Sequence, residues 1–286
     1  MIDTAEYDDV LALRLTWWRS RLVGYAVHVY VVRNVLIDTG FPAVARDVLT
    51  IVREQGVRGA IVTHQHEDHA GNVEALARAG IPLGIDRHTH EAVAVHHPIG
   101  LYRHFTWRAM PPLRSRFEPF VDAALIPLHT PGHCIDHHVV WDNRTSTLFA
   151  GDLFLGVKVK VAHPYEDPRR QVESLRAMIE RRPERMFCAH RGLVGKPIRA
   201  LAAKADWMEA TIARVDAMSG AGASATEIRD RLFGRRGWTH WFSAGDYSPD
   251  NFVRAIMRGR DDGEADRLTA PPSGTPSDTT VELPLS

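Results

Sequence analysis

Four potential metal ligands stand within six residues of the chain, in the run Thr63-His64-Gln65-His66-Glu67-Asp68-His69. His64 and His66 are two positions apart, so in an extended segment both side chains point to the same side. Asp68 and His69 follow where the chain is expected to turn into a helix. Zinc binds imidazole nitrogen and carboxylate oxygen, and a catalytic zinc site keeps one position open for water. The run therefore predicts a catalytic metal site on a strand-to-helix loop.

A pair of metal ions needs more ligands than this run offers, and three later residues are candidates. His133 follows Thr130-Pro131-Gly132, Asp152 follows Ala150-Gly151, and His190 follows Cys188-Ala189. Each stands at the end of a predicted strand or in the loop just after one. Two metals about 3.5–4 Å apart can clamp a water-derived nucleophile and polarise an ester-like carbonyl together. The spacing thus indicates a binuclear site built from strand ends.

The strands and helices that must position these residues are expected in two similar successions along the chain. Short apolar runs predict strands, and apolar residues at helical spacing predict helices between them. The predicted strands are 25–32, 35–38, 60–63, 124–128, 139–141, 148–150 and 186–189, and the predicted helices follow Pro42, run from Asn72 to Gly80 and span 171–182. Strands mixed with helices in this order favour a layered α/β architecture.

Three other regions depart from this rhythm. Residues 86–120 are rich in His, aromatic residues and Arg, and we interpret them as an insertion, part helix and part loop, of the kind that forms lids. Residues 1–196 would form the catalytic domain and 197–260 a helical C-terminal region, in which Ser224 and Glu227 form a capping-box pattern. Residues 261–286 have little to bury and predict a disordered tail.

Composition narrows the class of protein. Lys and Arg together equal Asp and Glu at 35 each, so nothing global favours nucleic acid or an anionic membrane, although a local basic patch is not excluded. The start is acidic, without the pattern of a signal peptide, and no apolar run approaches the roughly 20 residues of a membrane helix. The two cysteines, Cys134 and Cys188, predict reduced thiols. We expect a cytoplasmic enzyme with a small-molecule substrate and no membrane or nucleic-acid partner; the oligomeric state stays open, a homodimer included.

The ordered set of motifs resembles the metallo-β-lactamase superfamily over about residues 20–195. Its pattern is His-x-His-x-Asp-His, then a His after Pro-Gly, an Asp after Gly, and a final His. The resemblance implies a four-layer αββα sandwich, here with a helical C-terminal appendage. It implies that one metal is held by His64, His66 and His133, the second by Asp68, His69 and His190, and that Asp152 bridges both.

Several neighbouring residues take their expected roles from the same resemblance or from local pattern. Asp38 matches an Asp that supports the site from behind the ligands, and equally well a turn-forming Asp before Gly40. His137 is expected to be structural. Lys158 and Lys160 alternate as on a strand, and could hold a substrate carboxylate or face solvent on a sheet edge.

The resemblance to glyoxalase II-like thioesterases implies hydrolysis of a small ester-like bond, a thioester or lactone, by metal-bound hydroxide. Two zinc ions are the expected cofactors, with iron or manganese as alternatives. The catalytic residues would be Asp68 as a proton acceptor, Asp152, and Tyr165 as a hydrogen-bond donor to the oxyanion.

Two rival functions remain open. An iron-dependent oxidoreductase that acts on persulfides would keep the same motif residues. A nucleic-acid hydrolase would use the C-terminal helices as a small winged-helix-like module, with a basic face formed by Arg229, Arg231, Arg235 and Arg236. A solvated helical region packed on the main domain is the plainer interpretation of those helices.

Overall fold

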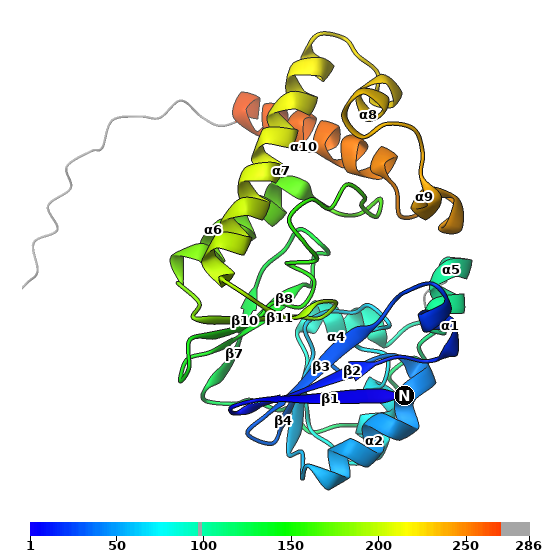
Figure 1. Cartoon of the computed structure of the whole chain (residues 1–286), viewed down its shortest axis with the longest axis vertical. Helices are drawn as coiled ribbons and strands as arrows, with labels where there is room; N and C mark the ends of the chain where they lie inside the picture. The colour runs from blue at the N-terminus through cyan, green and yellow to red at the C-terminus, as the bar shows by residue number, and fades with distance from the viewer. Residues whose placement is uncertain (97–98, 270–286) are drawn as a thin grey trace, which may run out of the picture.

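Two β-sheets face each other in the computed structural model, which describes residues 1–96 and 99–269 (Figure 1). The first sheet has the order β1-β2-β3-β4-β5-β6 and the second β11-β10-β9-β8-β7. The strands of the first are β1 Ile2–Tyr7, β2 Val10–Leu15, β3 Val27–Val32, β4 Val35–Ile37, β5 Gly59–Ile61 and β6 Leu83–Gly84. Those of the second are β7 Leu125–His129, β8 His138–Asp142, β9 Thr147–Phe149, β10 Arg185–Cys188 and β11 Gly192–Val194.

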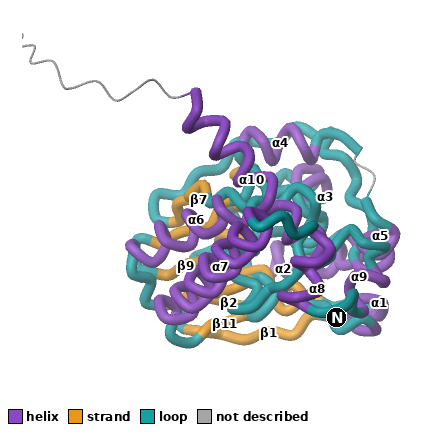
Figure 2. The backbone as a smooth tube through the Cα atoms, turned by 90° about the horizontal axis from the view of Figure 1, so that it is seen from above, coloured by secondary structure: helices purple, strands orange, loops and turns teal. Residues whose placement is uncertain are grey.

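Helices lie on the outer faces of the sheets, and Figure 2 shows α6 and α7 lying over strands of the second sheet, while α10 packs against α6, α7 and α8. Their bounds are α1 Trp18–Leu22, α2 Ala45–Glu54, α3 Val73–Arg78, α4 Arg87–Val93, α5 Leu101–Thr106, α6 Pro168–Glu180, α7 Pro197–Gly220, α8 Ala225–Phe233, α9 Trp238–Phe242 and α10 Pro249–Thr269, with a 3₁₀ turn at Pro42–Val44. The α/β class and the αββα layers predicted from the sequence are confirmed.

The structure has three buried apolar layers, one outside each sheet and one between the sheets. Alternate side chains of one strand belong to different layers. In β3, Val27, Val29 and Val31 pack with the helices outside the first sheet, while Tyr30 and Val32 pack between the sheets. In the second sheet, Phe149 and Phe187 occupy the same inner layer. Successive strand side chains point to opposite faces, so one buried strand serves two layers. This explains why the strands are apolar throughout and do not alternate with polar residues.

The predicted strands and helices are present with shifted ends, but four strands were not predicted: β1, β2, β11 and the two-residue β6. Strand β1 is largely exposed and polar, and it pairs only with β2 at the edge of the first sheet. Strand β2 lies between β1 and β3, and its Leu13 and Leu15 are buried. Strand β11 has three residues only and pairs with β10. An exposed edge strand lacks the apolar pattern that identifies buried strands.

The C-terminal helices pack mainly against α6 and against one another. Leu201, Ala205 and Met208 of α7 share one buried cluster with Val139 and Met186 of the strands. The helical C-terminal appendage predicted from residue 197 onward is present, and its first helix, α7, shares a buried core with the strands. The described residues 197–269 contain helices and no strand, so they lack the wing of a winged-helix module.

Two of the predicted segments, 86–120 and 261–286, lie partly outside the described residues. The 86–120 insertion contains helices α4 and α5 with irregular segments around them, and its residues His97 and Pro98 lie outside the described residues. Helix α10 continues to Thr269, so it includes residues 261–269 of the segment predicted as a disordered tail. A helix already nucleated extends at one hydrogen bond per residue even through polar sequence. Residues 270–286 lie outside the described residues.

Parallel pairing brings the ends of four strands to one edge of the molecule. Strand β4 pairs in parallel with β5, and β9 with β10. Ligand sites in α/β folds form at the carboxyl ends of such strands. The loops that follow these four strands carry Asp38, the ligand run at 64–69, Asp152 and His190. Among the described residues, no helix combines the length and apolar character needed to cross a bilayer.

We predict that Glu74 ties the insertion to helix α3 in a pH-dependent way. Its carboxylate accepts hydrogen bonds from the backbone N–H groups of Arg114 and Ser115 and from the side chain of Arg78. Burial alone would raise the pKa of Glu74, but these donors outweigh it and hold the pKa at about 2. The folded pKa lies below the unfolded value, so this contribution is present above about pH 4.5 and is lost as the pH falls toward 2.

Glu74→Gln should therefore lower the free energy of unfolding by about 1–3 kcal/mol at neutral pH. The gap between variant and wild type should close as the pH falls through the acid range. Urea unfolding of chelator-treated protein at several pH values measures it. Glu91→Gln, which removes an exposed carboxylate paired with Arg87 on α4, is the control. A gap that stays constant with pH would contradict the role given to the carboxylate.

Candidate metal centre

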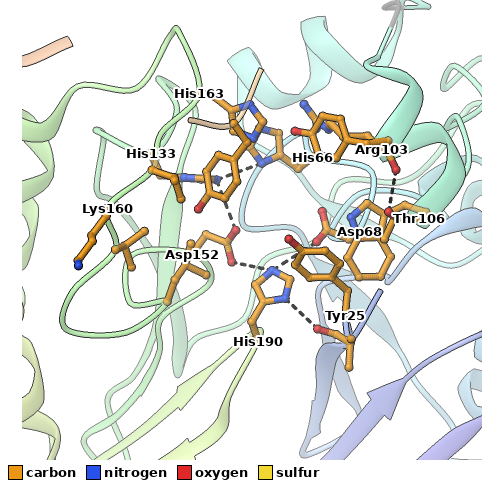
Figure 3. Close-up of a pocket in the computed structure, with 18 of the residues that line it drawn as sticks. Tyr25, His66, Asp68, Arg103, Thr106, His133, Asp152, Lys160, His163 and His190 are labelled. Atoms are coloured by element: carbon orange, nitrogen blue, oxygen red, sulfur yellow. Dashed lines mark hydrogen bonds and ion pairs between the residues drawn. The ribbon is translucent and has the colours of Figure 1, made fainter. Parts of the chain in front are cut away.

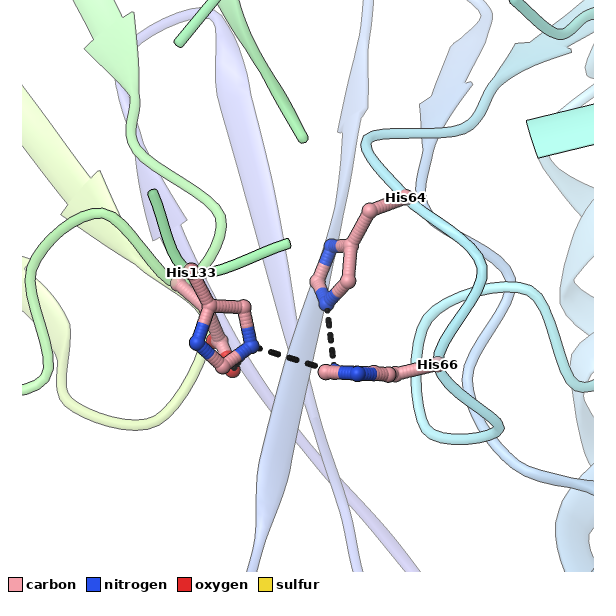
Figure 4. A group of neighbouring side chains, drawn as sticks. His64, His66 and His133 are labelled. Atoms are coloured by element: carbon pink, nitrogen blue, oxygen red, sulfur yellow. Dashed lines mark hydrogen bonds and ion pairs between the residues drawn. The ribbon is translucent and has the colours of Figure 1, made fainter. Parts of the chain in front are cut away.

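Three imidazoles converge on one point at the end of the first parallel strand pair (Figure 4). His64 Nε2 lies 3.0 Å from His66 Nδ1, and His133 Nε2 lies 3.1 Å from the same His66 atom. His64 and His66 come from the loop after β5, whereas His133 comes from the β7–β8 loop of the other sheet. All three side chains are buried. The two sheets thus contribute to one potential metal position, and Asp152 lies close enough to complete it.

A second set of ligands lies on the other side of Asp152 (Figure 3). Asp152 Oδ1 is 3.4 Å from His69 Nε2 and 3.3 Å from His190 Nε2, while its Oδ2 is 3.4 Å from His133 Nε2. Asp68 Oδ2 lies 3.3 Å from His190 Nε2. The two oxygens of one carboxylate therefore face two different groups of ligands. The structure brings together all seven residues that the sequence pattern predicts.

The nitrogen that each imidazole turns away from the centre has a partner in four of the five rings. His64 Nδ1 donates to Thr63 Oγ1 at 3.0 Å, His66 Nε2 lies 2.8 Å from the Tyr165 hydroxyl, and His190 Nδ1 donates to the Ala26 carbonyl at 2.8 Å. His69 Nδ1 donates to Asp38 Oδ2 at 2.7 Å. Such partners fix which nitrogen carries the proton and leave the inward nitrogen with a free lone pair.

Asp38 fills both of the roles that its sequence position allowed. Besides His69, it accepts hydrogen bonds from the Thr63 backbone N–H at 2.8 Å and from the Thr63 hydroxyl. Its backbone has φ of 60°, in the left-handed region that non-glycine residues rarely adopt. A strained, buried carboxylate that orients a ligand ring is typical of a functional site.

The convergent atoms fit a cation. Burial lowers the pKa of His64 and His66 well below the usual imidazole value, so their inward nitrogens present lone pairs to each other. His69 Nε2 and Asp152 Oδ1 are buried without a hydrogen-bond partner. Burial would lower the pKa of His190, but Asp152 and Asp68 outweigh it and raise that pKa. Unpaired lone pairs and carboxylates gathered at these distances require positive charge, which divalent metal ions would supply.

A hydrogen-bonded turn holds the shared carboxylate from behind. The backbone N–H of Asp152 donates to His137 Nε2 at 3.1 Å. Lys204 Nζ, from α7, donates to the Leu153 carbonyl at 2.6 Å, and the Cys188 thiol donates to the Phe154 carbonyl. His137 thus supports the turn. Neither Lys204 nor this use of Cys188 was evident from the sequence, because a lone Lys within an Ala-rich helix pattern indicates an exposed position.

Gly151 explains why the turn before Asp152 is so tight. Its φ is 48°, and a Cβ there would lie 2.8 Å from His137 Nε2. A side chain at this position would both strain the backbone and displace the imidazole that holds Asp152. The Gly-Asp pair of the sequence motif is therefore a packing requirement of the ligand loop.

A cavity of about 490 Å³ opens over the centre. The rings of Tyr25, Tyr102, Trp107 and Tyr247 line it. The proposed ligands His66, Asp68, Asp152 and His190, labelled in Figure 3, line it as well. This volume lies in the range of small-molecule sites, which are mostly apolar with a few placed polar groups. Tyr247, from the segment before α10, and His163 were not predicted as pocket residues, since no local motif marks them.

Helix α5 of the insertion is tied directly to the metal motif. Arg103 makes a two-pronged ion pair with Glu67, with Nε to Oε1 at 2.7 Å, and both side chains are largely buried. Arg103 Nη1 also lies 3.4 Å from the Tyr165 hydroxyl. That hydroxyl also contacts His66 Nε2, so Tyr165 lies beside a ligand ring, and its role as a hydrogen-bond donor to the oxyanion stays a prediction.

The segment 153–161 is irregular and lines the cavity, so the edge-strand interpretation of Lys158 and Lys160 is wrong. Side chains occupy its carbonyls: besides Lys204 and Cys188, Arg191 Nε donates to the Leu155 carbonyl at 2.6 Å. A segment whose carbonyls are taken this way has no ladder to join. Both lysines are exposed at the cavity margin.

Sequence comparison places the chain in a family. The profile of the metallo-β-lactamase superfamily matches residues 22–190, more than half of the chain. The chain therefore belongs to the metallo-β-lactamase superfamily, as the motif pattern predicted. Superfamily membership and the His and Asp groups together support a metallo-hydrolase.

Individual relatives are more distant. A "Beta-lactamase-like protein 2 homolog" from Drosophila melanogaster is 29% identical over 179 residues, which cover 58% of this chain and 57% of the relative. A hydroxyacylglutathione hydrolase from Methylobacillus flagellatus is 27% identical over 154 residues, 52% of this chain and 55% of the relative. The chain thus matches little more than half the length of these curated relatives.

Solved structures agree on the fold. A metallo-β-lactamase family protein from Thermus thermophilus superposes with a TM-score of 0.62 at 18% identity, covering 91% of this chain and 95% of the other. A metallo-β-lactamase from Pseudomonas aeruginosa in its mono-zinc form gives 0.55 at 16% identity, covering 73% of this chain and 95% of the other.

Removing the support behind His69 should weaken metal binding without dismantling the fold. Asp38→Ala is expected to lower metal affinity about 10–100-fold, because His69 loses the acceptor that orients its ring. Competition with a coloured chelator measures the affinity. Asp142→Asn removes another buried carboxylate, which pairs with Arg33 far from the centre, and should leave metal affinity unchanged. Equal losses in both variants would mean that the effect is general destabilisation.

Lys204 should make stability rise with pH in the alkaline range. Burial lowers the pKa of Lys204 to about 8 from 10.5. The unfolded state then binds more protons than the folded state between these values, so wild type gains stability as the pH rises from 8 to 10.5. The gain is up to about 3 kcal/mol.

Lys204→Met should lack this gain, while exposed Lys196→Met should retain it. Denaturant unfolding of chelator-treated protein across this pH range tests the difference. Parallel pH profiles for wild type and Lys204→Met would show that the ammonium is not desolvated in the folded protein.

Proposed function

We propose that this protein is a binuclear metal-dependent hydrolase that cleaves a small ester-like bond, with a thioester or lactone as substrate and two zinc ions as cofactors. One observation carries the proposal: Asp152 directs its two oxygens to two ligand sets at the floor of a small-molecule cavity. The hydroxyacylglutathione hydrolase among the relatives supports the thioester. We propose a small-molecule substrate and a cytoplasmic location; the free, buried thiols of Cys134 and Cys188 are compatible with the latter.

The chain's own residues define what each part of the site does. His64, His66 and His133 would hold one ion, Asp68, His69 and His190 the other, and Asp152 both. When bound, such ions lower the pKa of a coordinated water to about 7 and polarise a carbonyl. The Asp68 carboxylate faces the cavity and is the group placed to accept a proton.

The cavity walls would select and orient the substrate. Tyr25 and Trp107 line the cavity and would offer an apolar wall to the substrate. Lys158 and Lys160 at the margin favour a substrate with an anionic group remote from the scissile bond. Arg103, neutralised by Glu67, would position α5 and not bind charge.

The test begins with metal content of protein purified without added metal, measured by mass spectrometry. Wild type should contain about two zinc per chain, and His66→Ala much less. His129→Ala, an exposed histidine outside the centre, should match wild type. The same three proteins are then assayed with thioester and lactone panels before and after chelation.

Hydrolysis that is lost on chelation, restored by zinc and absent from His66→Ala would support the proposal. Iron in the purified protein with oxygen consumption on persulfides would instead establish the oxidoreductase. Cleavage of RNA or DNA without turnover of either panel would establish the nucleic-acid hydrolase. The buried ion pairing of Arg229 with Asp230 and Asp250 removes one arginine from the basic face that this rival requires.

A further inference from the structure

The most exposed tryptophans of the protein gather on two short helices. Of seven tryptophans, Trp18 on α1 and Trp238 and Trp241 on α9 are 63%, 73% and 69% exposed, and the other four are buried or partly buried. Leu22 on α1 and Leu101 on α5 are 72% and 89% exposed. We call these five residues the aromatic face. Large apolar side chains so exposed in one region are typical of a binding surface.

The spacing within each helix directs these side chains outward together. Trp18 and Leu22 are four residues apart, and Trp238 and Trp241 are three apart, so each pair lies on one side of its helix. On α5, Leu101 lies four residues before Phe105. Each helix thus exposes an apolar side.

Contacts between the helices make these sides continuous. Trp18 packs edge-on against Phe105 of α5, with ring centroids 6.4 Å apart. Tyr102 of α5 packs against Phe242 of α9 at 5.8 Å, and Phe242 stacks on Trp238 at 5.6 Å. Both views show α1, α5 and α9 grouped on the same side of the molecule (Figures 1 and 2). Segments from the start, middle and end of the chain therefore form one surface.

The three segments that form this surface carry basic side chains and no acidic ones. Residues 17–25, 99–110 and 233–245 contain six arginines and no Asp or Glu. Arg103 and Arg236 pair with carboxylates from elsewhere. Among the described residues, four of the six make no ion pair, and they are Arg19, Arg21, Arg108 and Arg235. Arg19 stacks over the rings of Trp17, Trp18 and Phe105.

We propose that the aromatic face docks this protein on the surface of an anionic lipid bilayer. Exposed Trp and Leu side chains with interspersed Arg match the headgroup boundary, where aromatic rings and basic residues bind together. Anionic headgroups complement the free arginines. This inference is independent of the proposed hydrolysis, since it uses no residue of the metal centre.

Two other occupants fit the surface less well. A second copy meeting this face through a twofold axis would bring the unpaired arginines of the two copies together. The carboxylates nearest to the face, Glu67, Asp246 and Asp250, already bind Arg103, Tyr102 and Arg236. A nucleic acid would satisfy the arginines and could stack on tryptophan, but it offers nothing to the aliphatic side chains of Leu22 and Leu101. A bilayer satisfies all three kinds of side chain.

The face adjoins the mouth of the cavity. Helix α5 turns Tyr102, Arg103 and Thr106 toward the cavity, and Gly24 and Tyr25 just after α1 line it as well. The same two helices therefore form part of the cavity wall and part of the docking surface. Docking brings the mouth of the cavity to the lipid surface.

Flotation of the metal-loaded full chain with vesicles tests the proposal. Phosphatidylcholine vesicles with phosphatidylserine should bind the wild type, phosphatidylcholine alone should bind it less, and added salt should release it. Trp238→Ser combined with Trp241→Ser, and separately Arg21→Glu, should each reduce binding about tenfold. Tryptophan emission should shift to the blue on vesicle binding in wild type and not in the double variant.

Matched controls come from exposed residues elsewhere. Leu193→Ser and Arg144→Glu remove an exposed apolar side chain and an exposed cation on other elements and should bind as wild type does. Metal content, unchanged in every variant, shows that folding is intact.

Four outcomes would overturn the proposal. Two come from flotation: wild type floats with neither kind of vesicle, or the variants bind as tightly as wild type. A wild-type dimer that the double variant dissociates, without vesicle binding, would assign the face to a second copy. Salt-sensitive retention of RNA without vesicle binding would assign it to nucleic acid.

Discussion

The whole arrangement depends on a cluster of buried polar atoms that only positive charge can satisfy. Three imidazole nitrogens lie within 3.0–3.1 Å contacts, and Asp152 places one oxygen near each ligand set. Without a cation these atoms would face each other across a buried, poorly solvated space, at a cost in folding free energy. The fold must therefore hold the cluster by other means, and metal binding then recovers that cost as binding energy.

The fold brings the ligand residues together, and hydrogen bonds from behind orient their imidazole rings. Two parallel strand pairs bring four loops to one edge, so the ligands are close before any metal binds. The outward nitrogens of the rings are then fixed by Thr63, Asp38, Tyr165 and Ala26. The match to the superfamily ends at residue 190, yet Lys204 and Tyr247 from beyond it hold the Asp152 turn and line the cavity. The C-terminal helices are thus part of the functional unit.

Most of the proposed ligands are marked locally in the sequence, whereas His190 follows an ordinary strand end and was assigned through the family resemblance. A His-rich run after a strand, a His after Pro-Gly and an Asp after Gly are patterns visible within a few residues. The layered fold was predictable for a similar reason, since buried strands are apolar throughout. The supports were not predictable, because Lys204, Glu166 and Ala26 act through contacts between segments far apart in the chain, and Glu166 Oε2 lies 3.7 Å from His133 Nδ1 without any motif to indicate it.

One local sequence pattern gave a wrong prediction, because contacts with distant segments determine the structure there. The segment 157–160 alternates as a strand does, but neighbouring carbonyls are bound by three side chains, and the segment becomes a cavity wall. The overall charge left such local arrangements open. Equal numbers of acidic and basic residues describe the chain, while three helices distant in sequence gather arginine and tryptophan without a carboxylate. Net charge is a sum over the surface, whereas a partner meets one face of it, so only the folded arrangement identifies where binding can occur.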